Sequence, residues 1–274
     1  MISLYPHELK HPNELKLGRF PDGTLHMKYP KELISGPAEI IWKYDGDEEL
    51  FALIALVQRL RNDGCREINL YLPYVPNARQ DRVKNFEDIF TLKSFASVIN
   101  WLGFHSVKIL DAHSNVTPAL LDRVFEVSPE PLIRIAAAHA RQLSTDGTKL
   151  IAFYPDEGAM KRYSGMLDLP YCFGMKQRDW KTGQIMDLTV CGETDMIQGA
   201  DVLIVDDICS RGGTFCWSAE KLKALGANRI YLYVTHCENT IFEGRVLTDG
   251  LIERVITTDS ILRRQSDKIE VISI

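Results

Sequence analysis

The chain has 274 residues, with 32 Lys and Arg against 37 Asp and Glu and a net charge of −5. This length suits one large domain or two compact ones, and the charge balance gives no reason to expect nucleic acid as a partner. The six cysteines are scattered without a CxxC pair, which excludes a disulfide scaffold or a zinc ribbon and predicts free, mostly buried thiols. No apolar run approaches the roughly 18 residues of a membrane span, and the N-terminus lacks the order of a signal peptide. We therefore expect a soluble, cytoplasmic protein with no membrane partner.

Short apolar runs alternate with segments of helical period, the order typical of a mainly parallel sheet covered by helices. Three helices are expected, over residues 48–62, from Thr91 to Gly103 and from Thr214 to Gly226. The predicted strands are residues 68–74, 107–110, 150–154, 202–205 and 230–234. The apolar stripes predicted on the helices are Leu50, Ile54, Val57 and Leu60; Leu92, Phe95, Ile99 and Leu102; and Phe215, Ala219, Leu222 and Leu225.

The order of these elements predicts two α/β halves. The best punctuation between them is the VSPEP stretch at residues 127–131, where two prolines interrupt the pattern. We therefore expect one domain over residues 1–130 and a second over residues 131–274.

The most informative segment is DVLIVDDICSRGGT, residues 201–214. A buried strand is expected to end in Asp206 and Asp207, and Thr214 is expected to open a helix after two glycines. The first N–H groups of a helix favour an anion, and glycine lets the backbone approach phosphate oxygens. Consecutive carboxylates beside this phosphate cradle could bind sugar hydroxyls or help to hold a metal. A pentose phosphate fits both features, although an ordinary strand-to-helix turn with solvated acids would give the same spacing.

Five further segments carry polar groups at turns or after apolar runs. They are FPDGT at 20–24, YVPNARQDR at 74–82, LDAHS at 110–114, PDEG at 155–158 and KQR at 176–178. Together with residues 201–214, they resemble the ribose-phosphate pyrophosphokinase family of the type I phosphoribosyltransferase fold. The resemblance runs from about Arg19 to Val271. It implies two phosphoribosyltransferase-like domains, each a mainly parallel sheet flanked by helices.

The resemblance implies that the N-terminal domain binds ATP. Phe20 would stack on adenine, and the paired donors of Arg79 suit phosphate oxygens. Thr24 stands where the family usually has an acid. The implied ATP-binding residues are Phe20, Asp22, Gly23, Thr24, Arg79, Gln80 and His113.

The C-terminal domain would bind ribose 5-phosphate by the same resemblance. The implied residues are Asp206, Asp207, Ser210, Arg211, Gly212, Gly213 and Thr214. His113 is the implied ligand of the Mg²⁺ that accompanies the nucleotide, and Asp156 that of a second Mg²⁺. Lys176 and Arg178 are the implied catalytic cations, at the base of a loop that closes over the β-phosphate.

The implied reaction is Mg²⁺-dependent transfer of the diphosphoryl group of ATP to the C1 hydroxyl of ribose 5-phosphate, which forms phosphoribosyl pyrophosphate and AMP. The family also implies a homo-oligomer, either a dimer or a hexamer. Besides Thr24, three residues depart from the family pattern: Ser210 and Arg211 replace Asp-Thr, and Ala159 replaces a glycine. The alternatives are a phosphoribosyltransferase that consumes phosphoribosyl pyrophosphate, or a catalytically weak regulatory relative of the synthetase.

Overall fold

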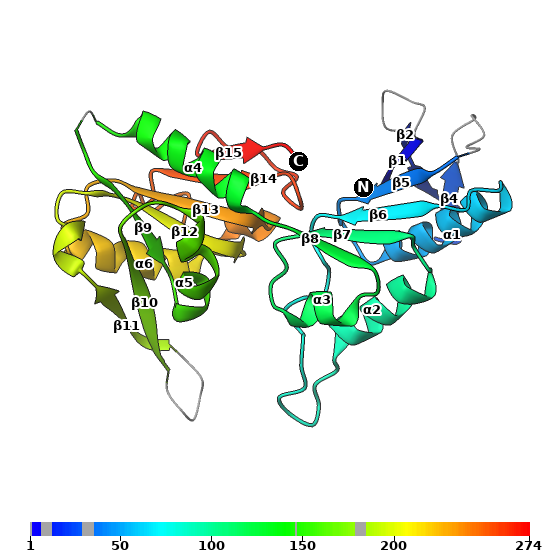
Figure 1. The fold of residues 1–274 in the computed structure, drawn as a ribbon, viewed down its shortest axis with the longest axis horizontal. Helices are drawn as coiled ribbons and strands as arrows, with labels where there is room; N and C mark the ends of the chain where they lie inside the picture. The colour runs from blue at the N-terminus through cyan, green and yellow to red at the C-terminus, as the bar shows by residue number, and fades with distance from the viewer. Residues whose placement is uncertain (1, 7–12, 29–35, 146, 179–184) are drawn as a thin grey trace. The chain divides into compact units, whose positions relative to one another are not determined.

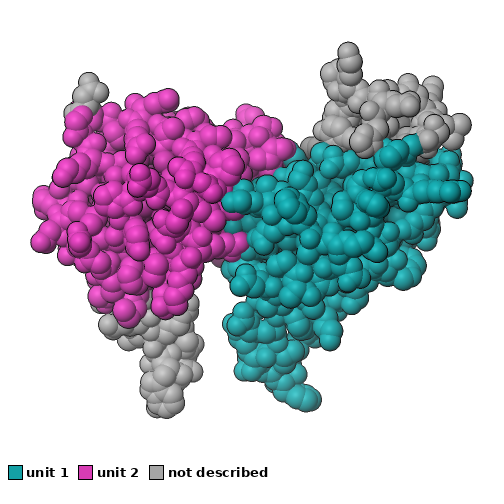
Figure 2. All heavy atoms as spheres, in the orientation of Figure 1, with its two compact units in different colours: residues 1–128 teal, residues 129–274 magenta. Residues whose placement is uncertain are grey.

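The computed structural model describes residues 2–6, 13–28, 36–145, 147–178 and 185–274. The chain divides into two compact units, residues 1–128 and residues 129–274 (Figure 2). The division falls inside the VSPEP stretch, just before the boundary expected after residue 130. We call residues 1–128 unit 1 and residues 129–274 unit 2, and describe each by itself.

Within its described residues, unit 1 contains a six-stranded sheet in the order β2-β1-β5-β6-β7-β8 (Figure 1). Strands β5 to β8 run parallel, while β1 is antiparallel to both β2 and β5. The strands are β1 (Ile2–Pro6), β2 (Asn13–Glu14), β5 (Ala38–Trp42), β6 (Ile68–Leu72), β7 (Ser106–Leu110) and β8 (Val124–Val127). A separate antiparallel hairpin is formed by β3 (Lys16–Arg19) and β4 (Leu25–Lys28). The predicted strands at 68–74 and 107–110 are thus confirmed, with slightly different ends.

The helices of unit 1 are α1 (Glu48–Asn62), α2 (Thr91–Trp101) and α3 (Val116–Leu120). The predicted bounds of α1 are confirmed, but its predicted stripe is wrong in part. Leu53 and Leu56 are buried, whereas Leu50 and Ile54 are only partly buried. The face is rotated because Glu49 is also buried, where its Oε2 accepts a 2.8 Å hydrogen bond from Trp42 Nε1. A buried, bonded carboxylate is not visible in an apolar pattern.

Unit 2 contains, among its described residues, a seven-stranded sheet in the order β11-β10-β9-β12-β13-β14-β15. All neighbouring pairs are parallel except β10 and β11. The strands are β9 (Leu150–Tyr154), β10 (Tyr171–Arg178), β11 (Ile185–Gly192), β12 (Asp201–Cys209), β13 (Ile230–Cys237), β14 (Arg254–Thr258) and β15 (Ile269–Ile272). The mixed α/β class with mainly parallel sheets is confirmed.

Strands β12 and β13 are longer than the apolar runs predicted. Their pairing continues from Val202 with Ile230 to Cys209 with Cys237. The prediction that β12 ends at Asp206 and Asp207 is therefore wrong, because both acids lie inside the strand. The apolar run of β12 ends before Asp206, but the backbone hydrogen bonds between β12 and β13 continue past it, because they do not depend on apolar side chains.

Helices cover both faces of the unit 2 sheet (Figure 1). Leu203 and Val205 of β12 pack in one core with α4 (Glu130–Leu143) and α5 (Glu157–Tyr163), whereas Val202 and Ile204 pack in another with α6 (Gly213–Ala224). The short 3₁₀ helices are η1 (Ser164–Met166), η2 (Thr194–Ile197) and η3 (Asn239–Glu243). The prediction of central strands that are apolar on both faces is confirmed.

The start and end of α6 differ from the prediction. The helix begins at Gly213, so Thr214 lies in its first turn, and Gly212 occupies the capping position. Leu225 follows the helix and is 37% exposed, so it does not belong to the buried stripe. Among the described residues, none of the helices combines the length and the hydropathy needed to cross a membrane.

Candidate functional site

In unit 1, two of the predicted segments meet at one edge of the sheet. ARQDR follows β6 and LDAHS ends β7, and these neighbouring strands are parallel. Asp81 joins the segments: its Oδ1 and Oδ2 accept hydrogen bonds from Arg82 Nε (2.7 Å) and Nη2 (2.9 Å), and Oδ2 also accepts one from Ser114 Oγ (2.8 Å). The hydrogen bonds from Arg82, and then that from Ser114, hold the pKa of the buried Asp81 carboxyl well below its usual range. The carboxylate therefore stays charged and fixes one segment to the other.

The predicted phosphate ligands of unit 1 lie on the exposed side of this link. Arg79, Gln80 and His113 are all exposed. Gln80 is held at α2, because its Oε1 accepts a 2.7 Å hydrogen bond from Oγ1 of Thr91, the first residue of the helix. Asp111, two residues before His113, is fully buried and has a φ of +47°. Left-handed backbone at a residue other than glycine is strained, and such strain tends to gather at functional sites.

The FPDGT segment forms the turn of the β3–β4 hairpin, and so belongs to a separate sheet from ARQDR and LDAHS. Asp22 Oδ1 accepts hydrogen bonds from Thr24 N (3.0 Å) and Thr24 Oγ1 (2.7 Å), and both lower the pKa of Asp22. Gly23 takes the left-handed φ of +85° that the turn requires. The ring of Phe20 is 50% exposed and lies 4.8 Å from the ring of His26. A flat aromatic surface is thus presented at the tip of a rigid turn.

In unit 2, the two predicted sugar ligands differ in exposure. Asp207 is only 7% exposed, whereas Asp206 is partly buried. Asp206 Oδ1 accepts a 3.0 Å hydrogen bond from the backbone N–H of Asp207. Successive side chains of a strand point to opposite faces, so the two carboxylates leave β12 in different directions.

The predicted phosphate cradle lies between β12 and α6, and its shape depends on glycine. Gly212 has a φ of +74°, and a Cβ on it would lie 2.1 Å from Val246 Cγ2. Gly213 and Thr214 form the start of α6, where the first N–H groups have no carbonyl partner within the helix. Ser210 and Arg211 contact η3, the turn that follows β13. The geometry suits an anion at the start of α6.

Asp156 occupies the same edge of the unit 2 sheet as the cradle. It follows β9, which pairs in parallel with β12. Its Oδ1 caps α5 by accepting a 3.0 Å hydrogen bond from the backbone N–H of Ala159. The backbone N–H of Ala159, which stands where the family has a glycine, thus orients Asp156, the predicted metal ligand.

Lys176 and Arg178 lie in β10, and not in the loop after it. Only Tyr171 to Phe173 of β10 pair with β9, so residues 176–178 extend past the end of β9 that carries Asp156. Their backbone pairs with β11, with Lys176 opposite Leu188 and Arg178 opposite Ile185. Residues 179–184 of the predicted catalytic loop lie outside the described residues.

The described residues contain no group of three or more His, Cys, Asp or Glu side chains close enough together to hold a metal ion. The carboxylates of Asp156 and Asp206 supply hard oxygen donors at one edge of the sheet. Mg²⁺ commonly takes one or two carboxylates and completes its shell with water and substrate phosphates. This donor set therefore fits a Mg²⁺ that binds together with a phosphorylated substrate. The cysteines are free, and all but the partly buried Cys191 are buried, as predicted.

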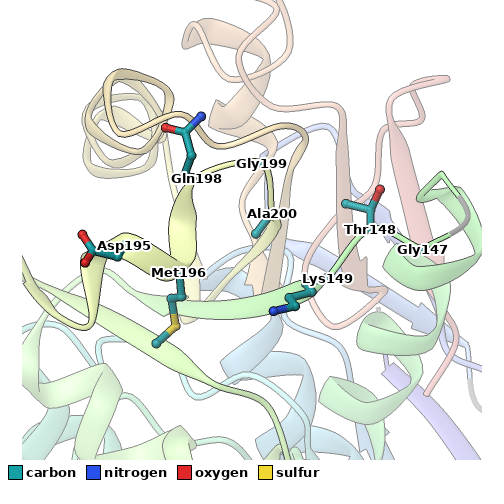
Figure 3. Close-up of a pocket in the computed structure, with 8 residues that line it drawn as sticks. All are labelled: Gly147, Thr148, Lys149, Asp195, Met196, Gln198, Gly199 and Ala200. Atoms are coloured by element: carbon teal, nitrogen blue, oxygen red, sulfur yellow. The ribbon is translucent and has the colours of Figure 1, made fainter.

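One pocket of about 480 Å³ lies away from all the predicted site residues (Figure 3). Lys149 and Ala200 line it and directly precede β9 and β12, so the pocket opens at the amino ends of these strands. Ligands of open α/β sheets bind at the carboxyl ends. We therefore place the candidate site at the carboxyl ends, where Ser114, Thr240 and Glu243 contact predicted site residues without having been predicted from the sequence.

Comparisons with known proteins show the family of the chain. No protein-family model matches the chain. The chain is 34% identical to the ribose-phosphate pyrophosphokinase of Thermococcus kodakarensis over 88% of this chain and 81% of the relative. It is 29% identical to that of Shewanella oneidensis over 89% of this chain and 78% of the relative. Phosphoribosylpyrophosphate synthetase from Mycobacterium smegmatis has a similar fold, with a TM-score of 0.76 at 19% identity over 95% of this chain and 86% of that one. The chain belongs to the ribose-phosphate pyrophosphokinase family.

Proposed function

We propose that the protein transfers the diphosphoryl group of ATP to the C1 hydroxyl of ribose 5-phosphate in a Mg²⁺-dependent reaction, giving phosphoribosyl pyrophosphate and AMP. The observation that carries the proposal is that this family member has polar and basic side chains at the carboxyl edge of one sheet, and a glycine turn that opens a helix at the carboxyl edge of the other sheet. The proposal includes a cytoplasmic homo-oligomer, a dimer or a hexamer.

Unit 1 would bind the nucleotide. Phe20 offers an exposed ring for stacking on adenine, with the Asp22 to Thr24 turn beside it for polar contacts. Arg79 would bind the triphosphate through its paired guanidinium donors, and Gln80, held by Thr91, would donate its amide. The Asp81 link would keep these residues in register with His113.

Unit 2 would bind the sugar phosphate. The start of α6, with Gly212, Gly213 and Thr214, would receive the 5-phosphate, together with Ser210 and Arg211. Asp206 and Asp207 would accept hydrogen bonds from the ribose hydroxyls.

His113 would be a ligand of the Mg²⁺ that accompanies ATP, and Asp156 of a second Mg²⁺ at the sugar site. When bound, the ions would polarise phosphoryl oxygens and offset their charge. The α5 cap fixes the Asp156 carboxylate before any ligand binds.

The chemical step forms a bond from the C1 oxygen to the β-phosphorus and breaks the bond from that phosphorus to the oxygen that leaves with AMP. The C1 hydroxyl gives up its proton in this step, and the proton is released to the bulk solvent with the products. Such reactions depend on alignment and on neutralising charge. Lys176 and Arg178 would supply positive charge to the transferring group, and closure of the segment that follows would exclude water.

The direct test incubates the purified protein with MgCl₂, ATP and ribose 5-phosphate and measures AMP and phosphoribosyl pyrophosphate by chromatography. Equal amounts of the two products are expected, and both should require Mg²⁺ and the sugar phosphate. Release of pyrophosphate from phosphoribosyl pyrophosphate and a base would instead identify a phosphoribosyltransferase. Absence of AMP with every pentose phosphate tried would favour the regulatory relative that Ser210 and Arg211 suggest. Light scattering would measure the assembly.

A further inference from the structure

Both residues of the phosphate cradle that depart from the family pattern are bonded to the same turn, η3. Ser210 Oγ lies 3.0 Å from Thr240 Oγ1, and Thr240 Oγ1 also donates to Glu238 Oε2 at 3.1 Å. Arg211 donates to Glu243 Oε2 from Nη2 (2.7 Å) and from Nε (3.2 Å). The sequence predicted no role for Thr240 or Glu243.

The backbone packing shows that this contact is built into the fold. A Cβ on Gly244 would lie 1.9 Å from the carbonyl oxygen of Arg211, so the chain after η3 touches the cradle backbone directly. A Cβ on Gly212 would meet the side chain of Val246, and Glu238 N donates to Cys209 O at 2.8 Å. Because the backbone of Gly244 and the side chain of Val246 pack directly on the cradle backbone, η3 and the cradle lie close together.

The ion pair between Arg211 and Glu243 is open to exchange. The side chains are 71% and 53% exposed, and pairs of this kind contribute only about 0–1 kcal/mol to stability. A phosphate at the start of α6 would offer the guanidinium charge-assisted hydrogen bonds of its own. Glu243 carries the same sign of charge as that phosphate, so the two compete for the same donor.

We propose that Glu243 tunes the affinity of the sugar-phosphate site by competing for Arg211, and that Thr240 is a positioning residue for Ser210. This inference rests on the proposed function. Glu243 holds the guanidinium of Arg211 at the mouth of the cradle when the site is empty and competes with the 5-phosphate for it. Only a ligand with enough negative charge at the cradle displaces the carboxylate, so the pair sets how tightly the site holds a sugar phosphate.

Calorimetric titration with ribose 5-phosphate in the absence of ATP tests this. Arg211→Ala should weaken binding about tenfold or more, since it removes a charge-assisted hydrogen bond to the phosphate. Glu243→Gln should tighten binding about three- to tenfold, because it removes an acceptor that competes for Arg211 and a negative charge that repels the phosphate. In the Arg211→Ala background, Glu243→Gln should have a clearly smaller effect, since the competition no longer exists.

The matched control is the ion pair of Arg245 and Glu220, whose side chains are also exposed. It joins the segment after η3 to α6, and its Nη2–Oε1 distance is 3.3 Å. Glu220→Gln removes the same charge from the same unit, and its affinity for ribose 5-phosphate should stay within twofold of the wild type. Circular dichroism of each variant shows whether it folds, and Arg211→Lys should restore part of the affinity.

Three results would overturn the inference. The first is that Arg211→Ala binds ribose 5-phosphate as tightly as Glu220→Gln does, and the second is that Glu243→Gln binds it more weakly than the wild type. The third is that Glu243→Gln changes the affinity equally with and without the Arg211 side chain. AMP formation by the wild type is measured separately. Wild-type AMP formation combined with a neutral Arg211→Ala would reject this inference and leave the proposed function standing. If the Arg211 and Glu243 variants showed the expected coupled effects on binding but the wild type formed no AMP, the proposed function would be rejected and this inference would stand.

Discussion

The two units have similar architectures, but their candidate phosphate-binding segments are held in place by different means. In unit 1, one buried carboxylate, Asp81, fixes two segments through side-chain hydrogen bonds. In unit 2, the cradle backbone is packed against the segment after η3, with the side chain of Val246 against Gly212 and the carbonyl oxygen of Arg211 against Gly244, where no Cβ fits. Side-chain donors can follow a flexible triphosphate, whereas backbone N–H groups suit one phosphate in one place. In two units of similar architecture, a few residues after the strands therefore determine how the candidate phosphate-binding segment is held.

The largest expected effect concerns Lys176, which we assign to the chemical step and not to holding either substrate. Lys176→Ala should lower kcat by about two to three powers of ten, the usual cost of losing a well-placed group that stabilises the transition state. The KM for ATP should change much less. Steady-state kinetics with both substrates would measure the two parameters.

Lys161→Ala is the control for this variant, because Lys161 is an exposed cation on α5 that pairs with Glu157 at 2.9 Å. It should leave kcat within twofold of the wild type. If Lys176→Ala instead weakened ATP binding with little change in kcat, unit 2 would be a nucleotide-binding element and the division of roles between the units would be wrong.

The second effect tests the backbone anchor of unit 2. Gly212→Ala should lower the free energy of unfolding by about 2–4 kcal/mol, since the left-handed backbone costs about 1–2 and the contact with Val246 adds overpacking. Ribose 5-phosphate binding should be lost while ATP binding is kept. Urea denaturation and titration with each ligand would measure this.

Gly250→Ala separates the two costs. Gly250 has a similar φ of +76°, but nothing lies within 4 Å of its Cβ position. It should therefore lose only about 1–2 kcal/mol, the conformational part alone. Equal losses at Gly212 and Gly250 would show that Val246 yields and that the cradle is not shaped by close packing.

The sequence predicted the class of the fold better than the ends of its elements. The α/β class and helix α1 follow from apolar periodicity, whereas the six motif segments and the roles predicted for them rest on the resemblance to the family. The extension of β12 through Asp206 and Asp207 could not be predicted, because it depends on backbone pairing with a distant strand. The same is true of the Asp81–Ser114 bond and the Ser210–Thr240 contact, whose partners are 33 and 30 residues apart in the chain.

The third effect tests the side-chain anchor of unit 1. Asp81→Asn should weaken ATP binding about tenfold, because it replaces the charge-assisted hydrogen bonds from Arg82 with weaker ones and offers the Ser114 hydroxyl a weaker acceptor. Ribose 5-phosphate binding should not change. Asp63→Asn is the control, since Asp63 accepts from Arg59 Nε at 2.8 Å at the end of α1. Equal effects of the two variants on ATP binding would mean that the link between the segments is not what holds the nucleotide site.

Acid titration of stability sharpens this test. The folded state lowers the pKa of Asp81, so its stabilising contribution is fully present above the unfolded pKa of about 4 and is lost as the pH falls toward the folded value. The wild type should therefore lose its stability advantage over Asp81→Asn below about pH 4. A difference between the two proteins that stays constant from pH 7 to pH 3 would exclude the charged link.

The smallest expected effect distinguishes the cradle itself from its support. Thr240→Val keeps the shape of the side chain and removes the hydroxyl that contacts Ser210, so the KM for ribose 5-phosphate should rise about two- to fivefold with kcat unchanged, which corresponds to one neutral hydrogen bond. Thr248→Val, which removes a hydroxyl bonded to Arg245 O at 3.3 Å, should leave both parameters unchanged. Because the backbone N–H groups at the start of α6 do not depend on Thr240, a larger loss would mean that the Ser210 side chain contributes more to 5-phosphate binding than these N–H groups. The contrast between the units would then be one of degree.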